Sequence, residues 1–275
     1  MSVSSGTLFH LTKDIETLGK ILCDRGFKIQ YCKEKLVQND NSELKYRVPM
    51  VSFFDLPLFQ LKNHIGSKSE IGRYGTYGIG LAKRKVGLTE PDRFNLRGPN
   101  PVIYVEKFSS LNASFRFIYE KLLKGKDPKL FTEMERHILN VFRFSKNYQS
   151  ALTRNGQTVD YRFSDEREWR WVPNLPDGGL PDDMLLVIPE DIYSEEIFFT
   201  EQNAKLEVPR FKFDLQDIEY LIVENEVDIL SLIRLLKSNE FIQAGLPTFF
   251  DVPDLNYSEW LQTRIITVNQ IKHDV

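Results

Sequence analysis

The sequence predicts an α+β fold in one domain, and three observations lead to that prediction. Short strand-like segments and longer segments with helical spacing follow one another without strict alternation. No internal repeat, low-complexity tract or linker divides the 275 residues, a length that suffices to bury a sizeable core. Apolar residues make up 41% of the chain and charged residues 27%, as in ordinary globular proteins. We therefore expect a single domain over residues 1–275, with a C-terminal extension from about residue 241.

Short apolar runs bounded by turn residues predict the strands. They lie at residues 7–11, 50–54, 74–81, 101–105, 168–172, 184–188, 196–200, 220–223 and 263–268. The polar segment 32–47 is rich in Asn, Lys and Glu, which is typical of a surface loop. We expect the strands to form a mostly antiparallel sheet with flanking helices.

Apolar residues at helical spacing predict the helices. Ile15, Leu18 and Leu22 mark the first helix, with Gly26 at its C-terminal end, and a second helix after Pro57 contains His64. Further helices are expected over residues 111–123, 130–144 and 227–236. In the helix over 130–144 the predicted apolar stripe comprises Leu130, Met134, Ile138, Val141 and Phe142.

Charge and cysteine content limit the class of protein. The formal net charge is −3 and the isoelectric point about 5.9, so no global basic field recruits nucleic acid. The two cysteines, Cys23 and Cys32, are best explained as reduced thiols. No apolar run approaches the roughly 20 residues of a membrane span, and the first residues lack the features of a secretory signal. We expect a cytoplasmic protein that does not contact a membrane.

Several common kinds of active site lack their sequence motifs. The four histidines include no pair at the i, i+4 spacing of a helical zinc site, so we expect no metal. Neither a Gly-x-Ser-x-Gly motif nor a phosphate-binding loop ending in Gly-Lys-Ser/Thr occurs. The glycines within 74–81 do not have the spacing of a dinucleotide fingerprint.

The segment 164–173, Ser-Asp-Glu-Arg-Glu-Trp-Arg-Trp-Val-Pro, has the densest concentration of chemically active side chains. On a strand that begins at Glu168, this residue shares one face with Arg170 and Val172, whereas both tryptophans lie on the other. A carboxylate held on a strand beside guanidinium groups suits stabilisation of a developing cation. The alternative is a solvated ladder of the charged residues Glu166, Arg167, Glu168 and Arg170.

Single residues elsewhere are ambiguous by themselves. His10 lies at the end of the first strand, directly before a helix, where a side chain can face a cleft; a lone histidine in apolar surroundings is more often structural. Tyr31, Tyr74 and Tyr77 serve either packing or stacking on a flat ring.

Six motifs in a fixed order resemble those of the AbiGi family of abortive phage resistance proteins. They are Leu-Phe-His-Leu-Thr at 8–12, the helix and turn at 18–27 ending in Arg-Gly-Phe, Val-Pro-Met-Val-Ser-Phe-x-Asp-Leu-Pro at 48–57, Tyr-Gly-x-Tyr-Gly-Ile-Gly-Leu at 74–81, Asn-Pro-Val-x-Tyr-Val at 100–105 and Asp-Glu-Arg-Glu-Trp-Arg at 165–170. That family is described as the antitoxin half of an abortive-infection pair. The resemblance implies a role in bacterial defence and a cognate toxin or antitoxin partner.

The first strand with His10 and the helix that follows it, together with Glu168 at the start of a later strand, also resemble DarT-like DNA ADP-ribosyltransferases. This second resemblance implies a split sheet of the ADP-ribosyltransferase kind and NAD as a substrate. It would place His10 beside the nicotinamide ribose and make Glu168 the catalytic acid. No counterpart of that family's NAD-contacting loop with arginine and asparagine occurs in this chain.

The residues that could bind NAD under this hypothesis follow from the chemistry of its parts. Tyr31 or Phe53 would stack on the nicotinamide, and Arg25 or Arg170 would pair with the pyrophosphate. The remaining candidates for contacts to the nucleotide are Ser52, Tyr74 and Tyr77. We expect His10, Ser52, Tyr77 and Glu168 to meet in one pocket.

Two functions therefore stay open. The first is an NAD-dependent transferase in phage defence that modifies an acceptor macromolecule, and the second is a non-catalytic antitoxin that binds a toxin. The antitoxin hypothesis requires an exposed apolar patch, for which residues 241–250 are the candidate. A nucleic-acid-binding regulator is disfavoured by the acidic isoelectric point. Glu166 competes with Glu168 for the acid role and shares its face only if the strand begins two residues earlier.

Overall fold

The computed structural model describes residues 5–83, 98–127, 130–173, 184–191, 195–206, 211–239, 241 and 256–273. Within these ranges the main sheet has the strand order β15-β14-β5-β1-β4-β11-β6. These strands are β1 (Thr7–Thr12), β4 (Glu43–Phe54), β5 (Tyr77–Ala82), β6 (Asn100–Pro101), β11 (Glu168–Trp171), β14 (Ile218–Val223) and β15 (Ile265–Thr267). Neighbours are antiparallel except β14 and β15, so the expectation of a mostly antiparallel sheet is confirmed.

Shorter strands extend or flank this sheet. Both β3 (Gln30–Val37) and β12 (Ile188–Pro189) pair with the long strand β4. Three small pairs stand apart from it: β2 (Gly26–Phe27) with β13 (Phe211–Lys212), β7 (Ile103–Val105) with β8 (Ser145–Asn147), and the hairpin of β9 (Gln149–Arg154) and β10 (Gln157–Arg162).

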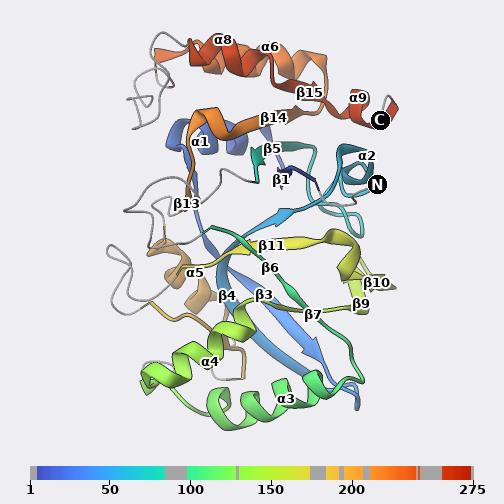
Figure 1. The fold of residues 1–275 in the computed structure, drawn as a ribbon, viewed down its shortest axis with the longest axis vertical. Coiled ribbons are helices and arrows are strands. Elements are labelled where there is room, and N and C mark those ends of the chain that lie inside the picture. Colours follow the sequence, from blue (N-terminus) through green and yellow to red (C-terminus); the bar gives the residue numbers. More distant parts are fainter. Residues whose placement is uncertain are drawn as a thin grey trace.

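The helices gather at the two ends of the sheet (Figure 1). At one end lie α1 (Ile15–Asp24), α6 (Glu226–Leu236) and α8 (Tyr257–Gln262), and at the other lie α3 (Ser110–Ile118) and α4 (Glu133–Arg143). The other helical segments of the described residues are α2 (Leu58–Leu61), the π-helix η2 (Tyr119–Leu123), the short helices η4 (Phe163–Glu166) and η5 (Leu215–Asp217), the nine-residue helix α5 (Glu196–Ala204) and α9 (Val268–His273).

Three buried clusters form the core around this framework. The largest joins α1, α6 and α8 to the sheet, through residues such as Leu22, Leu232 and Leu261. A second cluster packs α3 and α4 against the part of the β3–β4 pair that includes Leu36, Leu44 and Tyr46. A third cluster packs α9 against β1. The long β4 therefore passes from one core to another, and its middle lies between them.

The segment 32–47, predicted as a surface loop, instead forms most of the β3–β4 hairpin. Its buried residues include Leu36 of β3, and in β4 the buried Leu44 and Tyr46 alternate with the exposed Glu43 and Lys45. An amphipathic strand of this kind has a polar composition, which concealed its period of two. The prediction of a loop was wrong because strands with many polar residues resemble a loop in composition.

The segment 196–200, predicted as a strand, is the start of helix α5, which buries Phe199. Short apolar runs do not distinguish a strand from a buried helix turn. The helix α2 ends at Leu61, so His64 lies beyond it. The predicted stripe of the helix over 130–144 is wrong for Leu130, Met134 and Val141, which are exposed, and right for Phe142, which is buried together with Leu139.

The predicted strand over 184–188 is wrong except at Ile188, which belongs to β12, and the other predicted elements occur with shifted bounds. The first strand, the helix at Ile15 and the helix over 227–236 are present as β1, α1 and α6. In α6, however, Val227 and Leu230 are exposed, whereas Leu232 and Leu236 are buried. The candidate apolar patch 241–250 lies outside the described residues except for Phe241, which is buried. No helix among the described residues is long and apolar enough to cross a membrane.

Candidate functional site

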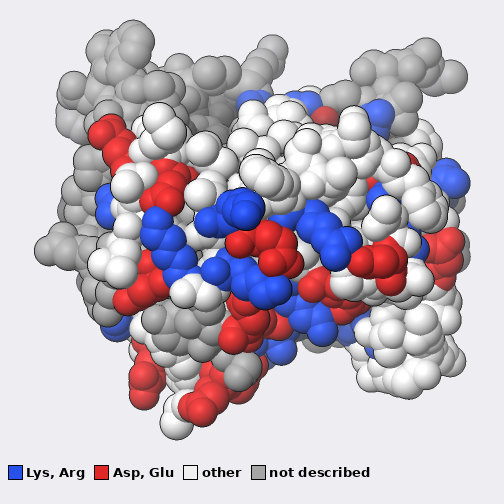
Figure 2. Space-filling view, turned by 90° about the horizontal axis from the view of Figure 1, so that it is seen from below, with Lys and Arg blue, Asp and Glu red and all other residues white. Residues whose placement is uncertain are grey.

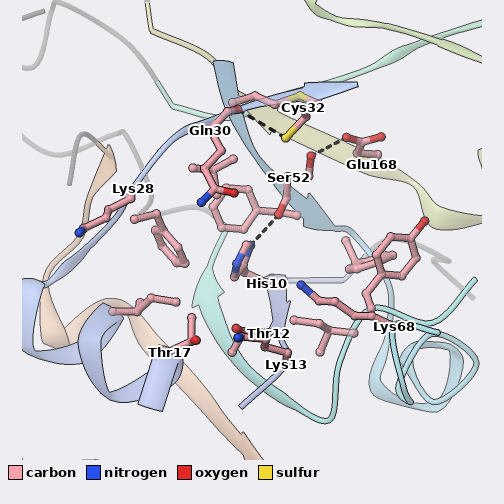
Figure 3. A pocket seen from close by; sticks show the side chains of 18 of the residues that line it. His10, Thr12, Lys13, Thr17, Lys28, Gln30, Cys32, Ser52, Lys68 and Glu168 are labelled. Atoms are coloured by element: carbon pink, nitrogen blue, oxygen red, sulfur yellow. Dashed lines mark hydrogen bonds between the residues drawn. The ribbon is translucent and has the colours of Figure 1, made fainter. Parts of the chain in front are cut away.

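A cavity of about 640 Å³ opens where β1, β4 and β11 lie next to one another in the sheet. Polar residues from all three strands line its wall: His10 and Thr12 from β1, Ser52 from β4 and Glu168 from β11 (Figure 3). Helix α1 and the residues before it, the strand β3 and the segment between α2 and β5 also line the cavity, as do Lys146 and Glu166. The volume lies within the range of small-molecule pockets.

The side chain of His10 is fixed by a hydrogen bond to the backbone of β4. Its Nδ1 lies 2.9 Å from the carbonyl oxygen of Ser52; because a carbonyl only accepts, Nδ1 carries the proton. Burial lowers the pKa of His10 to about 4, and the hydrogen bond to Ser52 offsets only part of that effect. The neutral ring therefore has an unprotonated Nε2, which can accept a hydrogen bond from a ligand.

This neutral state is a testable prediction. We expect the His10 ring to stay uncharged from pH 8 to about pH 5 and to titrate near pH 4 in the folded protein. At pH values between about 4 and 6.5, the imidazole of His10 is protonated in the unfolded chain but not in the folded protein. The contribution of His10 to the free energy of unfolding therefore decreases as the pH falls through this range. An NMR titration of the imidazole protons measures the pKa, with His10→Gln used to assign the resonance. A midpoint at 6 or above would contradict the prediction.

Glu168 is held by four donors. Its Oε1 accepts hydrogen bonds from Ser52 Oγ and Arg170 Nε, both at 2.7 Å. Its Oε2 accepts from Lys146 Nζ at 2.6 Å and from a terminal nitrogen of Arg170 at 3.2 Å. Burial by itself would raise the pKa of Glu168, but Arg170 and Lys146 outweigh it and hold the pKa well below the usual range. The carboxylate is therefore ionised at neutral pH.

Five charged residues are joined by ion pairs into a group that we call the ion cluster: Glu34, Lys146, Glu166, Glu168 and Arg170. Lys146 lies 2.8 Å from Glu166 and 2.6 Å from Glu168, and Arg170 lies 2.8 Å from Glu34. The cluster has three carboxylates and two cations, so its charge is negative when all five are ionised.

The surroundings of the cluster raise the pKa of both Lys146 and Glu34, for different reasons. The adjacent carboxylates raise the pKa of Lys146 well above its usual value in spite of its burial. Burial raises the pKa of Glu34, and the neighbouring Glu168 charge adds to that effect. A carboxylate excess at this point of the wall favours a ligand group that is positive or becomes positive.

Lysines line other parts of the same pocket: Lys13, Lys20, Lys28, Lys33 and Lys68. Figure 3 shows Lys13 and Lys68 on the His10 side, with Glu168 beyond Ser52. Partial burial lowers the pKa of Lys68, and the positive charges of Lys13 and Arg154 contribute. The pocket therefore combines a negative end with a positive rim, as a ligand with both cationic and anionic parts requires.

The predicted site residues separate into two groups. His10, Ser52, Phe53, Tyr74 and Glu168 line the pocket, as does Glu166. Arg25, Tyr31, Tyr77 and Arg170 are not part of its lining.

The residues outside the pocket have other contacts. Tyr77 donates its hydroxyl to Asp228 at 2.9 Å, and Tyr31 donates its hydroxyl to the carbonyl of Leu185 at 2.7 Å. Arg25 ends α1 in the left-handed conformation. Arg170 is fully buried, and its Nε donates a hydrogen bond to the carboxylate of Glu168 from outside the pocket lining.

The strand at Glu168 has the face pattern that the sequence predicts, but its charges are not solvated. Glu168 and Arg170 share a face, while Trp171 packs in the core cluster of the opposite one. Glu166, Glu168 and Arg170 are each at most 5% exposed, so the solvated ladder is wrong. Glu166 belongs to η4 and not to the strand, yet it reaches the same Lys146 as Glu168.

Sequence reasoning missed several residues of the site, among them Lys146, Glu34 and Lys68. Lys146 follows α4 in a Ser-Lys-Asn context with no motif around it, and only the fold brings it between Glu166 and Glu168. Glu34 was hidden in the segment predicted as a loop; the available signal was the two-residue spacing that puts it on the same strand face as Cys32 and Leu36. Lys68 lies in an irregular segment and had no sequence signal.

Comparison with known proteins assigns the chain to a family. The family model described as "Putative abortive phage resistance protein AbiGi, antitoxin" matches residues 25–224. The chain belongs to the AbiGi family. A curated relative, "Abortive phage resistance protein AbiGi" from Lactococcus lactis subsp. cremoris, is 26% identical over 225 residues, which cover 77% of this chain and 85% of the relative. No solved structure matches.

The region matched by the AbiGi model includes all five residues of the ion cluster and Ser52. It begins after His10 and Lys13, which belong to the first strand and the turn that follows it. Within the described ranges, no group of three or more His, Cys, Asp or Glu side chains is arranged to hold a metal ion.

Proposed function

We propose that this protein acts in abortive phage resistance and that its pocket binds NAD and cleaves the bond between nicotinamide and ribose. The observation that carries the proposal is the meeting of His10, Ser52 and Glu168, from three neighbouring strands, in one pocket of about 640 Å³. The six ordered AbiGi motifs and the family match support the defence role.

The charges of the pocket suit the two parts of this substrate. The nicotinamide ring of NAD is cationic, and the carboxylate excess of the ion cluster would attract it. The pyrophosphate is anionic, and the lysine rim that includes Lys13 and Lys68 would attract that part. The rings of Phe27 and Phe53 provide an apolar wall beside His10, at centroid distances of 5.0 and 5.8 Å.

The chemical step follows from the ionised state of Glu168. When the bond between C1′ of the ribose and the pyridine nitrogen breaks, the electron pair leaves with nicotinamide and a positive charge develops on the ribose ring. An ionised carboxylate stabilises that charge, and the acceptor then adds to C1′ and loses a proton. Ser52, Lys146 and Arg170 hold the carboxylate in position before the substrate binds.

A second candidate function is neutralisation of a toxin by binding. The family description contains the word antitoxin, and large apolar side chains are exposed in and around α3 and α4: Phe108, Phe117, Leu130 and Met134. On this hypothesis the ion cluster is a structural support and the apolar side chains contact a cognate toxin. The face of the molecule in Figure 2 intersperses basic with acidic side chains, which favours a protein over a nucleic acid as its partner.

A binding and turnover experiment with the purified protein separates the two functions. NAD⁺ at 100 times its dissociation constant is expected to stabilise the fold by about 2.7 kcal/mol in a thermal-shift assay, and nicotinamide is released. NADH serves as the control: it fits the same pocket, but its neutral dihydropyridine is a poor leaving group, so it binds without cleavage. If neither thermal stabilisation nor nicotinamide appears with NAD⁺, the transferase proposal fails and the antitoxin function remains.

A further inference from the structure

The segment between α2 and β5, residues 62–76, carries Lys68 and Tyr74 to the pocket, and we call it the pocket loop. Its end is pressed against β1 at Gly75. The φ angle there is +144°, and a Cβ on this residue would lie 2.0 Å from the carbonyl oxygen of Thr12. Gly66 donates its backbone N–H to Gly75 at 3.0 Å and closes the loop. Glycine is therefore required at position 75 by the close approach.

The outer side of the pocket loop is held by the tip of the β9–β10 hairpin. One guanidinium nitrogen of Arg154 donates to three carbonyl oxygens of the loop: Lys68 at 3.2 Å, Glu70 at 3.0 Å and Arg73 at 2.7 Å. The guanidinium carbon of Arg154 also lies 5.2 Å from the centre of the Tyr74 ring. More than 80 residues of sequence separate these partners.

The next residue of the hairpin adds a further contact. Asn155 donates its side-chain amide to the carbonyl of Ser69 at 3.0 Å. Asn155 and Gly156 have φ angles of 48° and 75°, the conformation of a tight two-residue hairpin turn. The turn thus fixes the direction in which Arg154 and Asn155 point, and both point at the pocket loop.

Both ends of the hairpin lead into the ion cluster. Strand β8, directly before β9, carries Lys146, and η4, directly after β10, carries Glu166. The hydroxyl of Tyr74, from the pocket loop, donates to this same Glu166. One continuous stretch of chain therefore contacts the charged wall of the pocket at its base and the lysine-bearing loop at its tip.

We propose that the β9–β10 hairpin clamps the pocket loop and that Arg154 is a positioning residue, which holds Lys68 where it receives the anionic part of the ligand. The identity of that ligand rests on the proposed function, whereas the clamp rests on the contacts of Arg154. An exposed lysine on a loop gains affinity for an anion when the loop is ordered before binding, because the ordering entropy is not lost on association.

The test compares Arg154→Ala with Arg154→Lys and with Arg162→Ala. Arg162 lies on the same hairpin, has the same charge and is exposed, so its replacement removes a positive charge without touching the loop. Hydrogen exchange of a peptide that spans residues 66–75 measures the clamp. We expect exchange there to rise about tenfold in Arg154→Ala and less in Arg154→Lys, with no change in Arg162→Ala.

The role of Lys68 has a separate readout that does not depend on NAD turnover. Labelling of lysine amines is followed by mass spectrometry with and without inorganic pyrophosphate, and Lys121 on η2 is the internal reference. We expect pyrophosphate to protect Lys68 in the wild type and to protect it about tenfold less in Arg154→Ala. With NAD⁺, Arg154→Ala raises KM about tenfold and leaves kcat within twofold.

The outcomes distinguish this inference from the proposed function. Equal exchange in Arg154→Ala and Arg162→Ala would overturn the clamp, and absence of protection of Lys68 by pyrophosphate in the wild type would overturn the anion contact. If the wild type neither binds nor cleaves NAD⁺ while exchange and protection follow the expected pattern, the clamp and its anion site stand and the transferase proposal fails.

Discussion

Arg170→Ala is expected to lower the free energy of unfolding by about 3–5 kcal/mol, because breaking a buried ion pair leaves uncompensated charge in the interior. Arg170 is fully buried and lies within 2.8 Å of both Glu168 and Glu34. Its guanidinium also donates to the carbonyls of Arg143 and Ser145, at 3.0 and 3.2 Å. The substitution therefore leaves two carboxylates and two carbonyls without this partner.

Urea denaturation of the purified variants measures this loss. The control is Arg116→Ala, because Arg116 pairs with Asp40 at 2.7 Å while both side chains are more than 40% exposed. That exposed pair contributes less than about 1 kcal/mol. A loss below 1 kcal/mol for Arg170→Ala would show that the ion cluster does not support the fold.

The pH dependence of the same measurement follows from Glu168. Its folded pKa lies below the ordinary value of 4.5, so the ionised carboxylate stabilises the fold at pH values above 4.5. This contribution is lost as the pH falls below 4.5 toward the lower folded pKa. The difference in the free energy of unfolding between the wild type and Arg170→Ala should therefore become smaller as the pH falls below 4.5.

Glu168→Gln is expected to reduce nicotinamide release by a factor on the order of 10² or more, because the amide retains the shape of the side chain without its negative charge. Glu166→Gln should reduce it less. Both variants remove one carboxylate charge from the contacts of Lys146, so they share much of the structural cost. The two variants differ in their other contacts, because Glu168 also accepts hydrogen bonds from Ser52 and Arg170.

The two glutamate variants are to be compared at matched soluble protein, with NAD⁺ turnover in vitro and phage protection in cells. Denaturation curves of both separate a catalytic loss from a loss of fold. Activity and protection like the wild type in Glu168→Gln would contradict the catalytic assignment. Protection without NAD⁺ turnover in the wild type would instead support the antitoxin function, and replacing Phe117 and Met134 by Asp should then abolish neutralisation of the toxin.

Residues whose role depends on local pattern were predictable from sequence. The strand at Glu168 is an example: the alternation of Glu168 and Arg170 with the tryptophans predicts two faces, and the structure has them. The helix at Ile15 is another, since its cap at Asp14 and its apolar spacing are local features. The pocket lining by His10 and Ser52 agrees with their positions on neighbouring strands.

Residues whose role depends on contacts between distant segments were not predictable. Tyr77 begins β5, the strand that pairs with the strand of His10, but its hydroxyl donates to Asp228 and the residue is not part of the pocket lining. The β3–β4 hairpin was missed because a polar amphipathic strand resembles a loop in composition. The contact of Arg154 with the pocket loop spans more than 80 residues and has no local signal.

The sequence by itself therefore determined the α+β class, the faces of the strand at Glu168 and the motifs of the AbiGi family, because each depends on neighbours within one or two turns of chain. The tertiary structure alone decided which charges meet. Lys146 joins Glu166 to Glu168 only because β8, η4 and β11 are packed together. The ionised state of Glu168 and the neutral state of His10 also depend on that packing, since burial acts on both pKa values and Lys146 of β8 joins Arg170, on the strand of Glu168 itself, in lowering the pKa of Glu168.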